Sequence, residues 1–89
     1  MQARRFLISG RVQGVGFRLF AYDAAAREGL TGWVQNRADG GVEVLAEGEG
    51  ASLERFERAL RHGPPRARVE TFEAELLPPS GAFFQFTVR

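Results

Sequence analysis

Apolar and polar positions alternate along several short runs of the chain, and a period of two is typical of a half-buried β-strand. Near the start, for example, Phe6 and Ile8 fall on one face while Arg5 and Ser9 fall on the other. The alternation predicts five strands, over residues 4–12, 30–37, 42–47 and 67–76 and over a short last run that contains Phe84, Phe86 and Val88.

Two other segments carry apolar residues three or four positions apart, which predicts amphipathic helices. The first helix begins near Phe17 and ends before Gly29, a residue suited to a C-terminal cap. For the second helix we expect Ser52 to be the N-cap and Gly63 to follow the end. The apolar stripes consist of Phe17, Phe20, Ala21, Ala24 and Ala25 in the first helix and of Leu53, Phe56 and Leu60 in the second.

The predicted elements follow the order βαββαβ, with one more short strand at the end. Because each helix has a single apolar stripe, both helices can cover the same face of one sheet. The order therefore predicts an α+β fold, a ferredoxin-like two-layer α/β sandwich with two helices on one face of an antiparallel sheet of four to five strands. With 89 residues, the chain is expected to form a single domain over residues 1–89.

The composition of the chain excludes several classes of partner and of catalytic chemistry. The formal net charge of +1 is too balanced to indicate a nucleic-acid partner, and no apolar run approaches the roughly 20 residues of a membrane helix. The chain has no Cys, which excludes disulfides and a thiolate nucleophile and fits a cytoplasmic location. We expect a monomer that binds neither nucleic acid nor membrane.

The stretch richest in possible chemistry joins the first strand to the first helix. Its glycines allow the backbone to curl so that several N–H groups point into one concavity. The helix N-terminus adds unpaired N–H groups and about half a positive charge, which together make an anion site. A tight strand-to-helix connection is the alternative interpretation. The loop residues are Gln13, Gly14, Val15, Gly16 and Phe17, followed by Arg18.

Arg18 favours the anion site. It falls in the first turn of the predicted helix, where the helix dipole disfavours a cation by up to about 1 kcal/mol. The next acidic residue along the chain is Asp23, beyond that turn. A phosphate or sulfate at residues 13–18 would satisfy Arg18 and the loop amides together, because a guanidinium suits a tetrahedral oxyanion.

Asn36 is the only Asn in the chain and closes the second predicted strand, just before the hairpin turn at Asp39-Gly40. Its amide could cap that turn. Alternatively, it lies beside the start of the first helix and holds a water by donating and accepting at once. His62 is the only His, so a zinc site would need carboxylates alone, and we expect no metal and no cofactor. By elimination, the nucleophile is water.

Two segments resemble the signatures of a known family. Gly10-Arg11-Val12-Gln13-Gly14-Val15-Gly16-Phe17-Arg18 resembles the first acylphosphatase signature, and Gly32-Trp33-Val34-Gln35-Asn36-Arg37-Ala38-Asp39-Gly40-Gly41-Val42 resembles the second. Gly63-Pro64-Pro65 and the closing Phe84-Gln85-Phe86-Thr87-Val88-Arg89 are also similar to family segments. The resemblance covers essentially the whole chain.

The resemblance implies a metal-independent hydrolase that converts small acyl phosphates into a carboxylate and inorganic phosphate. It assigns phosphate binding to the loop at residues 13–17 and to Arg18, and it assigns the positioning of the attacking water to Asn36. Two other functions remain open. The chain could be an acylphosphatase-like domain that binds a phosphoryl group or a partner without turnover. An RNA-binding sheet has the same topology, but it displays stacking aromatic residues where this chain has Glu43, Leu45 and Glu47.

Overall fold

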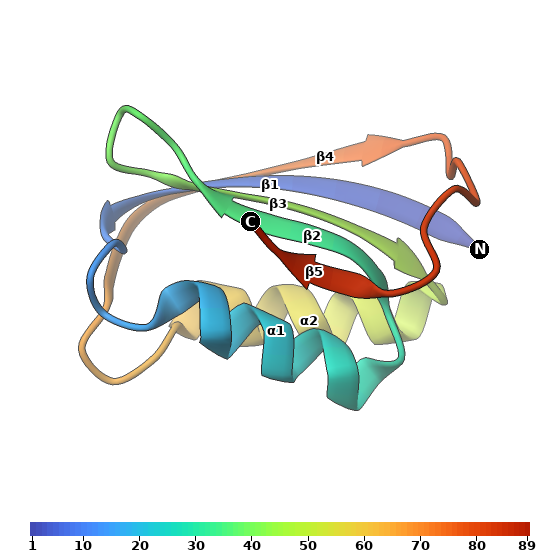
Figure 1. Ribbon diagram of the computed structural model, residues 1–89, viewed down its shortest axis with the longest axis horizontal. Helices are drawn as coiled ribbons and strands as arrows, with labels where there is room; N and C mark the ends of the chain where they lie inside the picture. The colour runs from blue at the N-terminus through green and yellow to red at the C-terminus, as the bar shows by residue number, and fades with distance from the viewer.

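Five strands and two helices follow the predicted order in a computed structural model that describes residues 1–89 (Figure 1). The sheet forms one layer, and both helices lie against the same face of it (Figure 1). The strands are β1 (Gln2–Arg11), β2 (Thr31–Asn36), β3 (Val42–Gly48), β4 (Arg68–Leu77) and β5 (Phe86–Val88), and the helices are α1 (Phe17–Glu28) and α2 (Gly50–His62).

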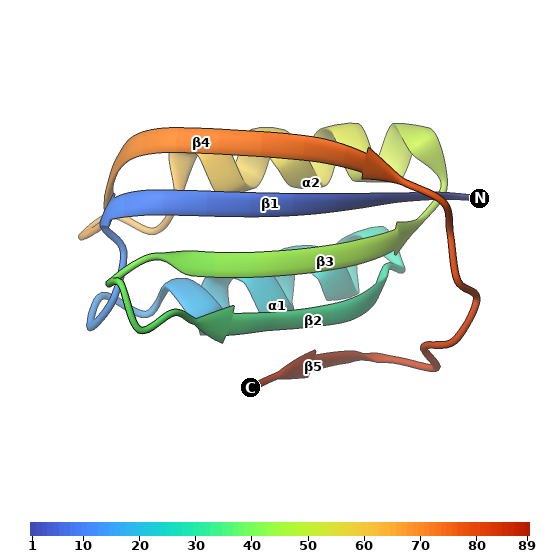
Figure 2. The same cartoon turned by 90° about the horizontal axis from the view of Figure 1, so that it is seen from above.

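The sheet confirms the predicted ferredoxin-like α+β fold, with one difference in strand direction. The strand order is β4-β1-β3-β2-β5, and the first four strands pair antiparallel. β5 instead pairs parallel with β2, so the sheet is mixed rather than wholly antiparallel. After β4 the chain crosses the end of the sheet and reverses direction on the far edge (Figure 2). Since β2 also runs opposite to β4, a strand added beside β2 on the way back is parallel to it.

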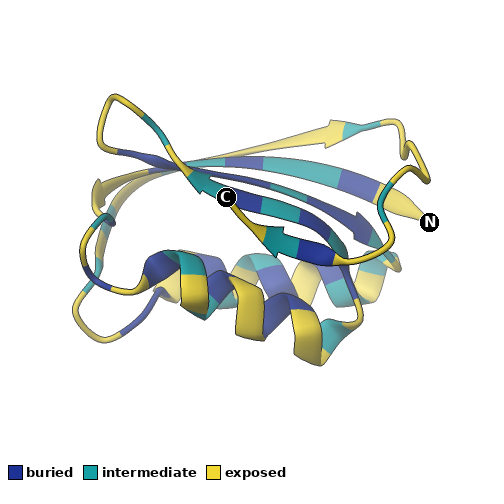
Figure 3. Cartoon of the chain, in the orientation of Figure 1, coloured by how far each residue is buried: buried dark blue, intermediate teal, exposed yellow.

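The core lies between the sheet and the helices, as the predicted apolar stripes require (Figure 3). In α1 the buried residues are mostly alanines, which let the helix lie close to the sheet, and Gly29 ends the helix in a left-handed conformation as predicted. In α2 the three predicted apolar residues are completely buried. The buried helical residues are Phe17, Ala21, Ala24 and Ala25 in α1 and Leu53, Phe56 and Leu60 in α2.

Two predicted boundaries are wrong in a way that local contacts explain, and the ends of the other strands differ from the prediction by at most two residues. Helix α2 begins at Gly50 with Glu49 as its N-cap, so Ser52 lies inside the first turn instead of capping it. The backbone of Glu49 is already extended, and its carbonyl accepts the N–H of Leu53. Strand β5 begins only at Phe86, because Phe84 is 99% exposed and packs on nothing that would hold it in the sheet. Neither helix is long and apolar enough to cross a membrane.

Candidate active site

The loop between β1 and α1 curls at two glycines. Gly14 and Gly16 have φ angles of 74° and 80°, in the left-handed region that glycine adopts without strain. Gly16 is also the N-cap of α1 and offers no side chain to the helix N-terminus. As a result, the backbone N–H groups of residues 14–19 donate to no acceptor within the protein. They form a cradle of free donors at the positive end of the helix dipole.

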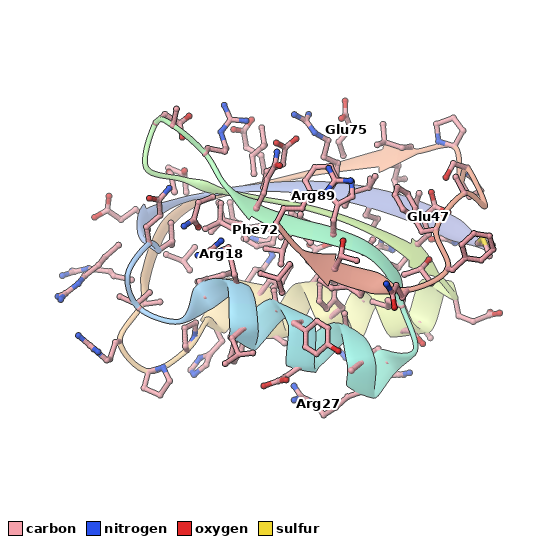
Figure 4. All side chains as sticks on the ribbon, viewed as in Figure 1. Arg18, Arg27, Glu47, Phe72, Glu75 and Arg89 are labelled. Atoms are coloured by element: carbon pink, nitrogen blue, oxygen red, sulfur yellow. The ribbon has the colours of Figure 1, made fainter.

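Arg18 lies in the first turn of α1, and that turn contains no acidic residue, as the sequence predicts. The hydrogen-bond acceptor for its guanidinium comes instead from the far end of the chain. One guanidinium N–H donates to the backbone carbonyl oxygen of Arg89 across 2.7 Å, and both residues are marked in Figure 4. This bond fixes the orientation of Arg18 and leaves most of its five N–H donors free.

Asn36 ends β2 on the same face as buried Val34, which is the face that the helices cover. Its carboxamide makes no hydrogen bond within the protein and is exposed. The turn-capping interpretation therefore does not describe this residue. Asp39 stabilises the hairpin instead, because its carboxylate accepts the backbone N–H of Gly41 at 3.0 Å and the Nε–H of Arg37 at 3.1 Å.

A pocket of about 280 Å³ brings the two signature segments together. Gly14, Gly16, Phe17 and Arg18 line it from the loop and α1, and Asn36 lines it from β2. Three further lining residues, which the sequence analysis did not select, are Val12, Leu19 and Val88. Val88 could not have been found by local pattern, because 70 positions of sequence separate it from Arg18 and only the β2–β5 pairing places it here.

Two of the predicted loop residues do not line this pocket. The side chain of Gln13 donates to the carbonyl oxygens of Arg37 and Gly41, at 2.8 and 2.9 Å, and so ties the loop to the β2–β3 hairpin. The side chain of Val15 is turned into the core and is 8% exposed. The backbone N–H group of Val15 belongs to the free donors, whereas Gln13 serves to hold the loop beside Asn36.

Arg18 is the only ionisable residue that lines the pocket. The nearest acidic residue along the chain from Asn36 is Asp39, and the bonds from Gly41 and Arg37 hold the pKa of its carboxyl below the ordinary value. Near neutral pH the carboxylate of Asp39 therefore stays ionised and hydrogen-bonded to Arg37 and Gly41. His62 lies in the last turn of α2 and does not reach the pocket.

The fold and the pocket define a class of protein. It is a two-layer α+β sandwich with a cradle of free amides and an arginine at a helix start, facing an unpartnered carboxamide at a strand end. A family model described as Acylphosphatase matches residues 4–88, and the chain belongs to the acylphosphatase family.

Relatives and solved structures agree with this assignment. A protein of Koribacter versatilis named Acylphosphatase is 47% identical, over 99% of this chain and 80% of its own length. One of Pseudomonas paraeruginosa with the same name is 54% identical, over 83% of this chain and 81% of its own. The crystal structure of acylphosphatase from Bacillus subtilis superposes with a TM-score of 0.96 at 38% identity, and the match covers 100% of this chain and 99% of that one.

Proposed function

We propose that this protein hydrolyses acyl phosphates to a carboxylate and inorganic phosphate, with Arg18 and Asn36 as catalytic residues and without a metal. One observation carries the proposal. A single pocket holds free backbone donors, one arginine and one unpartnered amide, and these groups come from two separate segments of the chain. Membership of the acylphosphatase family supports the same reaction.

The cradle suits the phosphoryl group of such a substrate. The free N–H groups of the β1–α1 loop and the N-terminus of α1 supply fixed dipoles, and Arg18 supplies a formal positive charge. Donors fixed before the reaction cost no reorganisation as charge develops on the phosphoryl oxygens. Phosphate, the product, is expected to bind at residues 13–18 for the same reason, and sulfate can replace it.

In this proposal, Asn36 holds the attacking water. Its carboxamide can accept one hydrogen bond from the water and donate another to it, and no residue of the protein competes for either. The water oxygen attacks phosphorus in line with the bond to the acyl oxygen. That bond breaks, and its electron pair leaves with the carboxylate. Positioning of this kind supplies most of the acceleration in phosphoryl transfer.

The proton of the attacking water passes to a phosphoryl oxygen of the substrate. An amide is not a base, and Arg18 is permanently protonated. Asp39 is held by Arg37 and Gly41, and its lowered pKa makes it a poor proton acceptor. The departing carboxylate needs no acid, because it is already a weak base. The products are a carboxylate and protonated inorganic phosphate.

The test is steady-state hydrolysis of benzoyl phosphate by the wild type and by Arg18→Gln. Loss of one preorganised donor to developing charge typically lowers the rate by about 10²–10³-fold. Arg27→Gln is the matched control, because Arg27 lies in the last turn of the same helix, away from the pocket. A folded Arg18→Gln protein with wild-type turnover would contradict the proposal. Phosphate binding without turnover in the wild type would instead indicate a binding domain.

We further propose that residues 1–89 act as one monomeric unit in the cytoplasm, with neither nucleic acid nor membrane as partner. The charge balance of 12 basic and 11 acidic residues and the absence of Cys support this setting.

A further inference from the structure

The pocket has an apolar side that phosphate binding does not use. Val12 and Phe17 form its floor and belong to the core, with exposures of 1% and 2%. Leu19 and Val88 form its rim and are 63% and 46% exposed. The core therefore does not explain these two side chains. Single exposed leucines are common, but this one borders the same pocket as Arg18, and a second exposed aliphatic side chain borders it too.

The rim also lacks a charge that could hold an ionic group. Arg18 is the only ionisable residue in the pocket, and in the proposed reaction it binds the phosphoryl group. Arg89 follows Val88, but its guanidinium stacks on the ring of Trp33 at 4.5 Å. Trp33 faces away from the helices, because it alternates along β2 with Val34, which is completely buried beneath them. The charge of Arg89 is thus held on the opposite face of the sheet.

The apolar surface continues away from the pocket. Tyr22 lies three residues beyond Leu19 on α1, so the two side chains are neighbours on the helix surface. Tyr22 is 41% exposed. The other neighbour of Leu19 on this surface is Asp23, four residues beyond it and exposed, so an acyl chain that extends along α1 meets Tyr22 and one negative charge, which would repel a carboxylate.

We propose that Leu19 and Val88 form an acyl subsite, and that this protein selects acyl phosphates whose acyl group is apolar and longer than acetyl. The proposal rests on the proposed function and names its substrate class. An apolar acyl group would remove the exposed surfaces of Leu19 and Val88 from water. A carboxylate at the same place would lose hydration and gain no partner.

Three substrates of similar leaving group test the subsite: acetyl phosphate, hexanoyl phosphate and adipoyl monophosphate, whose six-carbon chain ends in a carboxylate. We expect a kcat/KM for hexanoyl phosphate about tenfold above that for each of the other two, since even one methylene in an enclosed pocket is worth about tenfold or more. Leu19→Ala should lower the hexanoyl-to-acetyl ratio about three- to tenfold. Leu19→Lys should shift the preference from hexanoyl towards adipoyl.

Leu76→Ala is the matched control, because Leu76 is 72% exposed but lies on β4, at the opposite edge of the sheet from β5. It should leave all three rates unchanged. Equal wild-type rates for acetyl and hexanoyl phosphate, a preference for adipoyl, or a ratio unaffected by Leu19→Ala would overturn the subsite while the hydrolase stands. Failure to hydrolyse any of the three would overturn the proposed function itself.

Discussion

Arg18 and Asn36 are held by the fold in different ways. Arg18 is fixed at its guanidinium by the carbonyl oxygen of Arg89, whereas the carboxamide of Asn36 has no partner and is placed only by the backbone of β2. A fixed guanidinium loses little conformational entropy when it binds an anion. A free amide with both donor and acceptor available can turn to fit a water. The two settings agree with the roles that we propose for these residues.

The neighbourhood of Asn36 leads to a prediction about pH. The bonds from Gly41 and Arg37 lower the pKa of Asp39, so this carboxylate is ionised throughout roughly pH 5–8, where enzymatic acid–base pairs usually titrate. It has no proton to exchange in that range. We therefore expect kcat for benzoyl phosphate to show no bell-shaped dependence on pH there, and Asp39→Asn to keep the same profile. A basic limb that disappears in Asp39→Asn would mean that a protein group takes the proton.

At the level of single residues, local sequence was informative where the reason for a residue is local. Arg18 stands out because it opposes the helix dipole, and that conflict is visible within a single turn. The sequence predicts Gln13 in the phosphate loop, but its side chain bonds to hairpin carbonyl groups 24 and 28 positions away. Leu19 showed nothing unusual in the sequence. Its partner on the rim, Val88, is brought near only by the completed sheet.

Among the elements, β5 completes the site, because it carries Val88 and leads to Arg89. The segment that brings the chain to β5 is anchored at Glu47 in β3, which lies at the other end of the molecule from Arg18 in Figure 4. The carboxylate of Glu47 accepts the N–H and the hydroxyl of Ser80, at 2.9 and 2.7 Å, and the N–H of Gly81 at 3.0 Å. Glu47 is 3% exposed, so this anchor is shielded from water.

We predict that Glu47→Gln destabilises the protein by about 1–3 kcal/mol, because the buried amide would offer one acceptor oxygen to the three donors of Ser80 and Gly81. Burial raises the pKa of Glu47, but the bonds from Ser80 and Gly81 outweigh it and lower the pKa below the ordinary value. The contribution is therefore complete above the ordinary glutamate pKa and is lost as pH falls through the folded-state value.

Urea unfolding of the wild type and Glu47→Gln at several pH values measures this effect. The gap between them should be largest near neutral pH and shrink in acid. Glu73→Gln, on exposed β4, is the control and should change little at any pH. A gap that stays constant down to acid pH would show that the charge of Glu47 contributes nothing to the anchor.

The element boundaries show where pattern reasoning stopped. Alternation located β1 to β4 and the helical stripes, because burial against one layer sets both. It could not give the direction of β5, which follows from where the chain crosses the sheet after β4. The sequence also predicts Ser52 as the N-cap of the second helix, whereas Glu49 holds that position. Ser52 has the better capping side chain, but the extended backbone of Glu49 starts the helix three residues earlier.

For the whole molecule, the side chains available to bind a metal ion lead to a prediction about metals. The chain has no Cys and one His, and no three His, Asp or Glu side chains gather where they could hold an ion. Arg18 and the loop amides are available to balance phosphoryl charge instead. EDTA should therefore leave benzoyl phosphate hydrolysis unchanged, and phosphate should inhibit competitively. Activity lost on chelation and restored by a divalent ion would contradict this.

The molecule divides the proposed work between two connections at one end of the sandwich. In the proposed mechanism the β1–α1 loop and α1 bind the phosphoryl group and the end of β2 positions the water, and these segments lie at the same end of the molecule (Figure 1). Binding and positioning should therefore be separable by substitution, even though both groups face one pocket. The central claim is this division of roles between Arg18 and Asn36.

The most direct test is Asn36→Ala, with kcat for benzoyl phosphate and the inhibition constant of phosphate measured on the same preparation. We predict that kcat falls by about 10²-fold or more, because the water is no longer oriented for attack. The inhibition constant should stay within about twofold of the wild-type value, since Arg18 and the loop amides remain in place. A folded variant that keeps wild-type kcat, or that loses phosphate binding together with kcat, would contradict the division of roles.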